Sequence, residues 1–236
     1  RTVSRASEHM AVAAAALDEL LPAPATVYSS FGDPGVMLEE LDGSAEAAAV
    51  KLRSWLQSGG MQAPDQAALE EFLRQLREAA DDAAPRLQCT AYSLQRYRGV
   101  VYRLPEALGY VPPESLNMLP GEVYEVPGVG RVALDATDGP GLRLEDGQAL
   151  ELAWRSGGER CRPVGRAGSN SLKKLLQEGD VPPWWRDRVP LLYQEGELLE
   201  VGGLWPCEST RYCHEPTAEG ALWRLRWQRP DERSGD

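Results

Sequence analysis

The 236-residue sequence predicts an α+β fold, with a helical N-terminal region followed by a mostly β region that contains one short helix. Two changes along the chain support this. Apolar residues recur every three or four positions in the first part, as on one face of a helix. From Pro85 onward they alternate with polar residues in short runs separated by turns, as in strands. We expect four segments: a helical domain at 1–84, a β-hairpin with a Pro-rich linker at 85–120, a β-rich domain at 121–228 and a disordered tail at 229–236.

Three helices are expected in the first region. The Ala-rich stretch 2–21 predicts one that ends at Pro22. The stretch 45–57 predicts a second, with Gly59-Gly60 at its end. A third runs from Pro64, in its first turn, to about residue 80, with Asp65 near its N-terminus.

The β region begins with a hairpin, for which we expect strands at 86–95 and 96–104 and an exposed face that carries Arg96, Arg98 and Arg103. Residues 104–120 are Pro-rich and predict the linker. The expected strands that follow are 122–126, 130–135, 141–145, 149–155, 190–193, 198–201, 204–207 and 221–228. The last alternates Trp and Leu with Arg, which is typical of a half-buried edge strand.

Composition excludes some classes of protein. The sequence has a net charge of −11 and no apolar run long enough for a membrane span or a signal peptide. Its four scattered cysteines predict free buried thiols and a cytoplasmic location. Cys207, Cys213 and His214 lack the paired spacing of a structural metal site, so we expect no metal. The chain starts at Arg1 in what reads as the interior of a helix, and we expect it to be a fragment.

One stretch opposes the overall acidity. Residues 154–176, here called the cationic segment, carry six basic residues against one acidic residue, Glu159. Such a segment is a candidate surface for a polyanion, although a solvated loop would have the same charge pattern. A polar loop with Gly165 and Gly168 leads into an expected helix at 171–178, for which Ser171 can serve as the N-cap.

This stretch also carries a family resemblance. The matching residues are Gly158-Glu159-Arg160, Arg162-Pro163, Gly165, Ser171-Leu172-Lys173-Lys174, Pro182-Pro183-Trp184, Arg186-Asp187-Arg188 and Pro190 to Tyr193. In them the chain resembles the C-terminal domain of the bacterial tRNA(Ile)-lysidine synthetases. The helical pattern over 45–80, Arg96 to Gly99 and Gly203-Leu204-Trp205 fit the same family less specifically.

The resemblance implies that the parent enzyme uses ATP, with magnesium, to adenylate the wobble cytidine of tRNA(Ile) and attach lysine. It implies that the chemistry belongs to an N-terminal PP-loop domain and that this chain binds tRNA. We expect the tRNA-binding residues to be Arg160, Arg162, Arg166, Ser171, Lys173, Lys174, Trp184, Arg186 and Arg188. For Trp184 and Trp185 the alternative is packing on the β domain. Arg186 and Arg188 could instead pair with Asp187.

The sequence shows no catalytic constellation and no cofactor site. The family's phosphate loop reads S-G-G-x-D-S after a strand, whereas Ser58-Gly59-Gly60 here lacks the Asp and Ser and follows a helix. Two other functions remain open. One is a protein-interaction module that uses the acidic helical region 1–84. The other is an enzyme with its site in a groove between the two regions.

Overall fold

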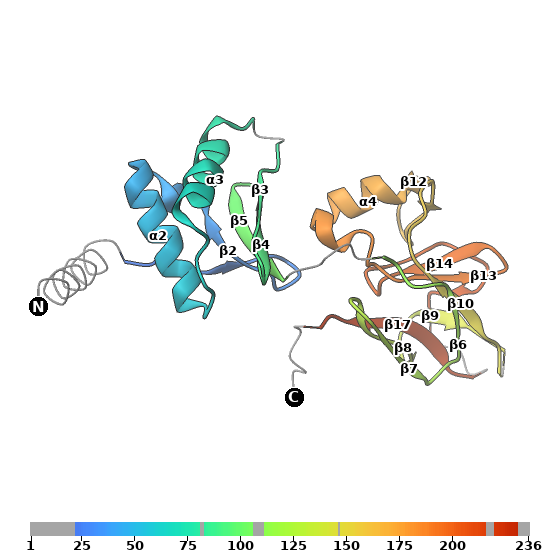
Figure 1. The fold of residues 1–236 in the computed structure, drawn as a ribbon. Helices are drawn as coiled ribbons and strands as arrows, with labels where there is room; N and C mark the ends of the chain where they lie inside the picture. Colours follow the sequence, from blue (N-terminus) through green and yellow to red (C-terminus); the bar gives the residue numbers. More distant parts are fainter. Residues whose placement is uncertain (1–21, 81–82, 106–110, 146, 216–219, 231–236) are drawn as a thin grey trace, which may run out of the picture. The chain divides into compact units, whose positions relative to one another are not determined.

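The computed structural model describes residues 22–80, 83–105, 111–145, 147–215 and 220–230. The chain divides into two compact units, Arg1–Leu108 and Gly109–Asp236, here called the first and the second unit. Both combine antiparallel sheets with helices (Figure 1), which confirms the α+β class. The helix predicted at 2–21 lies outside the described residues.

The first unit is a sheet covered on one face by two helices, α2 (Ala45–Ser58) and α3 (Gln66–Glu78), as Figure 1 shows. A 3-10 turn, η1 (Leu38–Leu41), precedes them. The sheet order is β1 (Val27–Tyr28), β2 (Pro34–Met37), β5 (Val100–Pro105), β4 (Tyr92–Tyr97) and β3 (Arg86–Gln88). Its core joins helix and strand residues, including the fully buried Leu52, Leu69 and Leu94. Burial of these apolar faces provides most of the driving force for the fold.

Both helices begin where the sequence offers a capping side chain. Ser44 accepts a hydrogen bond from the Ala47 amide at 3.1 Å, and Asp65 accepts one from the Ala68 amide at 2.9 Å. The third predicted helix therefore starts after Asp65, and Pro64 lies before the cap. At the other end of α2, Gly59 is the C-cap, as predicted.

The hairpin turns later than predicted and buries one of its arginines. Arg98 and Gly99 both have positive φ angles (49° and 74°), which is the backbone of a two-residue turn between β4 and β5. The prediction that Arg96 is exposed is wrong, because its side chain is only 7% exposed. Its guanidinium donates to the carbonyls of Leu76 and Ala79 at the end of α3, and these bonds compensate for its burial.

The hairpin belongs to the first unit and not to a separate linker segment. Strand β5 pairs with β2 as well as β4, so strands from both sides of the helices form one sheet. The observed division at residues 108–109 thus falls within the predicted 85–120 segment and differs from a helical domain that ends at residue 84.

The second unit has two larger sheets and a small two-stranded one. The first runs β15 (Trp205–Pro206), β14 (Glu197–Val201), β13 (Leu191–Gln194), β10 (Leu150–Ala153), β6 (Leu116–Met118). The second runs β16 (Tyr212–Cys213), β9 (Gly141–Arg143), β17 (Leu222–Gln228), β8 (Gly130–Thr137), β7 (Val123–Val126). The third pairs β11 (Arg160–Cys161) with β12 (Asn170–Ser171). Each strand predicted after residue 121 is present, with ends shifted by no more than two residues.

Strand β17 is not an edge strand, which corrects the prediction, since it lies between β9 and β8. Its link to the other large sheet is polar. The fully buried Glu200 of β14 accepts hydrogen bonds from Nε of Arg224 at 2.9 Å and from the Leu225 amide at 3.0 Å. Burial raises the pKa of Glu200, and Arg224 opposes that shift.

Close backbone approach also shapes this junction. Gly203 has φ +66°, and a Cβ atom there would lie 2.7 Å from the Leu225 carbonyl oxygen. Only glycine fits such a position without strain.

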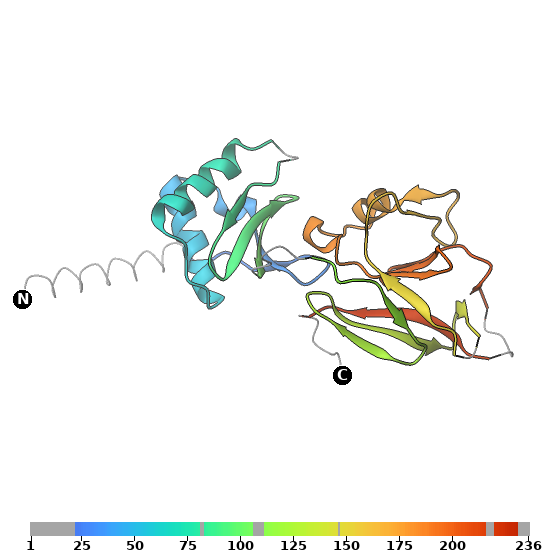
Figure 2. The same cartoon turned by 45° about the vertical axis from the view of Figure 1, so that its right-hand side comes forward.

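Figures 1 and 2 both show the helix α4 (Leu172–Glu178) on the side of the β10–β13–β14 sheet away from the β7–β8–β17 sheet.

Candidate nucleic-acid interface

The cationic segment folds as a tight hairpin that leads directly into α4. Arg160 pairs with Ser171 and Cys161 with Asn170, so β11 and β12 close the intervening loop at its base. Gly165 and Gly168 each have φ +78°, a conformation that a glycine adopts without strain. Ser171 caps α4 by accepting a hydrogen bond from the Lys174 amide at 3.4 Å, as predicted.

The loop is anchored to a distant part of the sequence. The Val164 amide donates to the Pro206 carbonyl at 3.0 Å, and the Glu208 amide donates to the Arg162 carbonyl at 2.7 Å. A disulfide joins Cys161 to Cys207, with their Cα atoms 5.8 Å apart. The prediction of free thiols is therefore wrong for this pair, because the fold brings together two cysteines that are 46 residues apart. Cys89 and Cys213 are free.

Alternation along β11 and α4 directs the basic side chains outward. In residues 160–163 the two arginines are exposed, whereas Cys161 and Pro163 are buried. In α4 the leucines Leu172, Leu175 and Leu176 are buried, and Lys173 and Lys174 are exposed. Both periodicities therefore place apolar atoms in the core and cations at the surface.

The cations differ in how far they are neutralised. Glu178 pairs with Arg166 at 3.2 Å and with Lys174 at 3.6 Å. Arg160 donates to the Ser169 carbonyl at 2.7 Å and keeps its charge. Within the described part of the chain, the side chains of Arg162 and Lys173 have no hydrogen-bond or ion-pair partner. These two are the cations best able to meet an external anion.

Glu159, the single acidic residue of the cationic segment, is held by hydrogen bonds from backbone amides. The Glu159 carboxylate accepts hydrogen bonds from the amides of Ser156 and Gly157. Burial acts to raise the pKa of Glu159, but these amides outweigh it, and the pKa is lowered. Arg155, at the start of the segment, pairs with Asp187 at 3.0 Å. Glu159 therefore stays charged while its oxygens bond to the turn that precedes β11.

The residues predicted at 184–188 follow α4, on and after a 3-10 turn, η2 (Pro183–Trp185). Trp185 is buried, 6.0 Å from Trp227 in an edge-to-face pair, so the packing alternative describes it. Arg186 donates to the Val181 carbonyl at 2.9 Å, and Arg188 donates to the Gly128 carbonyl at 3.1 Å. Trp184 is half-buried.

Two further residues shape the interface and were not predicted. Glu178 shields two of the cations, and its spacing of four from Lys174 on a helix is a signal that could have identified it. Glu208 accepts a hydrogen bond from the Gly165 amide at 3.1 Å. No local pattern identifies a partner 43 residues away.

The glycine pair of the first unit does not fit a phosphate loop. Ser58 donates its hydroxyl to the Trp55 carbonyl at 2.9 Å, and Gly59 and Gly60 end α2. The backbone amides of these two glycines donate to the helix's own carbonyls, as a helix C-cap requires. They are not available to hold the phosphates of ATP.

The described residues contain no group of three or more His, Cys, Asp or Glu side chains that could hold a metal ion. Of Cys207, Cys213 and His214, the first is bonded to Cys161. None of the described helices is long and apolar enough to cross a membrane.

Comparisons with known proteins agree on one family. The TilS substrate binding domain matches residues 43–102, and the TilS substrate C-terminal domain matches residues 150–227. A tRNA(Ile)-lysidine synthase of Coxiella burnetii is 31% identical over 97% of this chain and 50% of that protein. One from Alkalilimnicola ehrlichii is 35% identical over 86% of this chain and 46% of that protein. The chain thus spans about half the length of these curated relatives.

A solved structure titled "Crystal structure of TILS C-terminal domain" is also similar, with 18% identity and a TM-score of 0.39. The match covers 50% of this chain and 99% of that one.

Proposed function

Because the chain belongs to the tRNA(Ile)-lysidine synthase family, we propose that it recognises tRNA(Ile) and carries out no chemistry itself. Lysine is attached to the wobble cytidine by a separate N-terminal PP-loop domain, which uses ATP with magnesium. This chain holds the tRNA for that domain. The cytoplasm is proposed as the setting from family membership, because with Cys161 and Cys207 joined the cysteines no longer indicate it.

The observation that carries this proposal is the exposed pair Arg162 and Lys173. Both project from elements that are fixed in place, Arg162 by the anchored loop and Lys173 by the buried face of α4. Neither is neutralised within the described residues. Phosphate contacts from such cations dominate the affinity of proteins for nucleic acids. They orient the RNA without reading its sequence.

The other predicted residues take different parts in the proposal. Arg160 keeps its charge two positions before Arg162, and because both are exposed it can meet a second phosphate. Arg166 and Lys174 join once a phosphate competes with Glu178. Ser171 supports the interface as the cap of α4. Trp184 can stack on a base, whereas Arg186 and Arg188 contribute charge from side chains that already bond to the protein.

A matched pair of double variants tests the proposal. The test variant is Arg162→Gln with Lys173→Gln. The control is Arg131→Gln with Arg226→Gln, which removes the same charge from exposed arginines of the β7–β8–β17 sheet that pair with Glu125 and Asp135. Affinity for tRNA(Ile) is measured for both, together with the melting temperature.

The proposal expects the test variant to bind tRNA(Ile) at least about tenfold more weakly at low salt, with an unchanged melting temperature. The control should lose much less affinity. Equal losses in the two variants would mean that net charge, and not this hairpin, governs binding. If the unsubstituted chain binds no tRNA at all, the protein-interaction module becomes the better account.

A further inference from the structure

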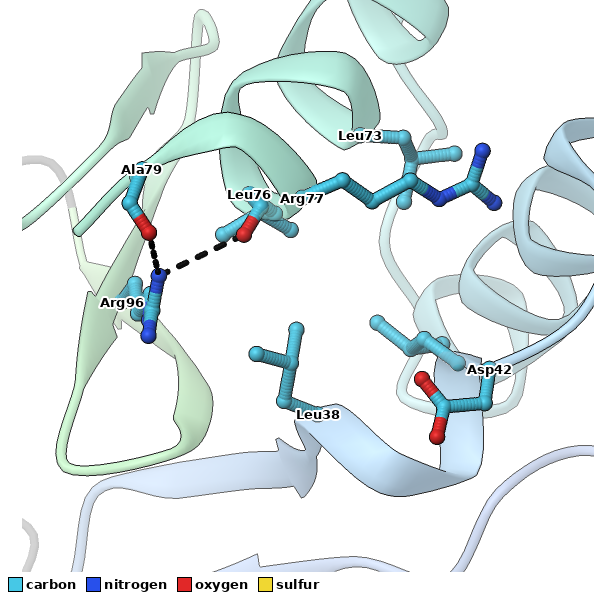
Figure 3. Close-up of a pocket in the computed structure, with 8 residues that line it drawn as sticks. Leu38, Asp42, Leu73, Leu76, Arg77, Ala79 and Arg96 are labelled. Carbon is cyan, nitrogen blue, oxygen red and sulfur yellow. Dashed lines mark hydrogen bonds between the residues drawn. The ribbon is translucent and has the colours of Figure 1, made fainter. Parts of the chain in front are cut away.

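The first unit contains a pocket of about 320 Å³ between η1 and α3, beside β4. Figure 3 shows Leu38 below this space, Leu73, Leu76 and Arg77 above it, and Arg96 and Asp42 on opposite sides. Its size is at the lower end of the roughly 300–1,000 Å³ common for small-molecule sites. Only a small ligand or one ring system of a larger ligand fits such a volume.

The apolar walls of the pocket are held firmly. Leu73 and Leu76 are each 3% exposed and belong to the core between the helices and the sheet. Arg96 is fixed by its bonds to the Leu76 and Ala79 carbonyls, at 3.3 and 3.2 Å (Figure 3). The pocket is therefore largely preformed, and a ligand would lose little of its binding energy in ordering the protein.

Two opposite charges lie at the rim without neutralising each other. Asp42 and Arg77 are both exposed, and no ion pair joins them in the part of the chain that the structure describes. Arg77 donates instead to the carbonyl of Gly43, the residue that follows Asp42, at 3.3 Å. This bond keeps the Arg77 guanidinium beside the chain at Asp42. The rim thus offers two carboxylate oxygens as acceptors and a guanidinium as donor, next to apolar walls.

We infer that this pocket binds a guanine base that is unstacked from the bound tRNA. This inference rests on the proposed function. A guanine presents two parallel N–H donors, on N1 and N2, which match the two oxygens of the Asp42 carboxylate. Its O6 and N7 acceptors match an arginine such as Arg77. One of its flat faces can lie against Leu38, the partly exposed leucine of the lining, and RNA is commonly read through single-stranded bases in such pockets.

The other bases fit the rim less well. Adenine and cytosine present an acceptor beside their amino group, which would face the Asp42 carboxylate and repel it. Uracil has a single N–H donor between two acceptors. The pair Asp42 and Arg77 therefore favours guanine by at least about tenfold, the effect of one good bidentate contact.

Nucleotide titrations test the site directly on the full chain. With ¹³C-labelled leucine methyl groups, guanosine monophosphate should shift the signals of Leu73 and Leu76. Adenosine monophosphate should do so at least about tenfold more weakly. Inosine monophosphate, which lacks the N2 amino group, should be intermediate. Equal shifts with guanosine and adenosine monophosphates, or none in these methyl groups, would overturn the inference.

A test substitution and a control substitution show whether the charged rim of the pocket causes the preference for guanosine monophosphate. Asp42→Asn should abolish the preference for guanosine monophosphate. The control Glu39→Gln removes the same charge from an exposed residue of η1 that does not line the pocket, and it should leave the preference intact. If Asp42→Asn leaves guanine selectivity unchanged, the pocket is not the site.

A measurement of tRNA(Ile) binding distinguishes failure of this inference from failure of the proposed function. Asp42→Asn should weaken tRNA(Ile) binding several-fold without changing its dependence on salt, because no phosphate contact is lost. Normal tRNA binding by Asp42→Asn, together with the expected loss in the Arg162/Lys173 variant, would refute the pocket as a site for a tRNA base and leave the proposed function standing. Binding of guanosine monophosphate with no effect of Asp42→Asn on tRNA would contradict RNA as the source of the base.

Discussion

Glu178 provides a test of the interface in which affinity should increase. Its carboxylate is shared between Arg166 at 3.2 Å and Lys174 at 3.6 Å, and all three side chains are 44–62% exposed. Removal of this charge by Glu178→Gln leaves both cations available to a phosphate. The expected result is tighter binding of tRNA(Ile), which few random surface substitutions would produce.

The magnitude follows from Coulomb's law and from screening. A unit charge about 8 Å from a phosphate in a water-like medium contributes about 0.5 kcal/mol, which is roughly a factor of two to three in affinity. With more than one phosphate nearby, we expect about two- to fivefold tighter binding at about 50 mM salt. The gain should disappear at about 500 mM salt, where the screening length is only a few ångströms.

Stability should change little, so the two effects can be separated. Exposed pairs of this kind contribute about 0.3–0.5 kcal/mol each. Glu178 is the last residue of α4, where the helix dipole disfavours a negative charge by a similar amount. The free energy of unfolding should therefore shift by less than about 0.5 kcal/mol.

The assay is fluorescence anisotropy with labelled tRNA(Ile), and the control is Glu197→Gln. Glu197 is exposed at the start of β14 in the same unit, so this variant has the same net charge. The reasoning is refuted if Glu178→Gln does not tighten binding, or if Glu197→Gln tightens it equally.

Three further outcomes are expected. Ser171→Ala should lower the free energy of unfolding by about 0.5–1 kcal/mol in urea denaturation, since the cap bond to Lys174 is long, and a loss above about 2 kcal/mol would indicate another role. Glu200→Gln should cost about 1–3 kcal/mol by the same measurement, because it removes the charge that pairs with the partly exposed Arg224; no loss would contradict the account of the sheet junction. Burial, assisted by Glu159, raises the pKa of Tyr193 to about 12. This tyrosine therefore contributes stability that is complete below about pH 10 and lost as the pH rises towards 12, and tyrosinate absorbance that titrates near pH 10 would contradict it.

Local patterns predicted the elements well because the responsible interactions are local. Asp65 and Ser171 lie at the helix starts where they were predicted, and Ser44 caps the helix predicted at 45–57, since a cap bond spans only three residues. The alternation of Trp and Arg in 221–228 correctly identified a strand. It could not show that the strand lies in the middle of its sheet, because alternation reports which face is buried and not which strands are adjacent.

For Arg96, the residue type suggested an exposed side chain, whereas its place in the alternating strand pattern would have indicated a buried one. It lies two positions after Leu94, so in a strand both point to the same, buried face. An arginine is seldom buried, and the carbonyls at the end of α3, 17 and 20 residues away, accept hydrogen bonds that compensate for its burial. The disulfide of Cys161 with Cys207 was not predicted for the same reason, since a contact across 46 residues leaves no signal in a single sequence.

The salt dependence of tRNA(Ile) binding tests the central claim most directly. Each phosphate neutralised by a cation contributes about 0.7–0.9 to the slope of log affinity against log salt. The account predicts that Arg162→Gln with Lys173→Gln lowers the magnitude of that slope by about 1.4–1.8, with the matched Arg131/Arg226 control unchanged. An unchanged slope in the test variant would contradict the claim that these two residues contact the phosphates of tRNA.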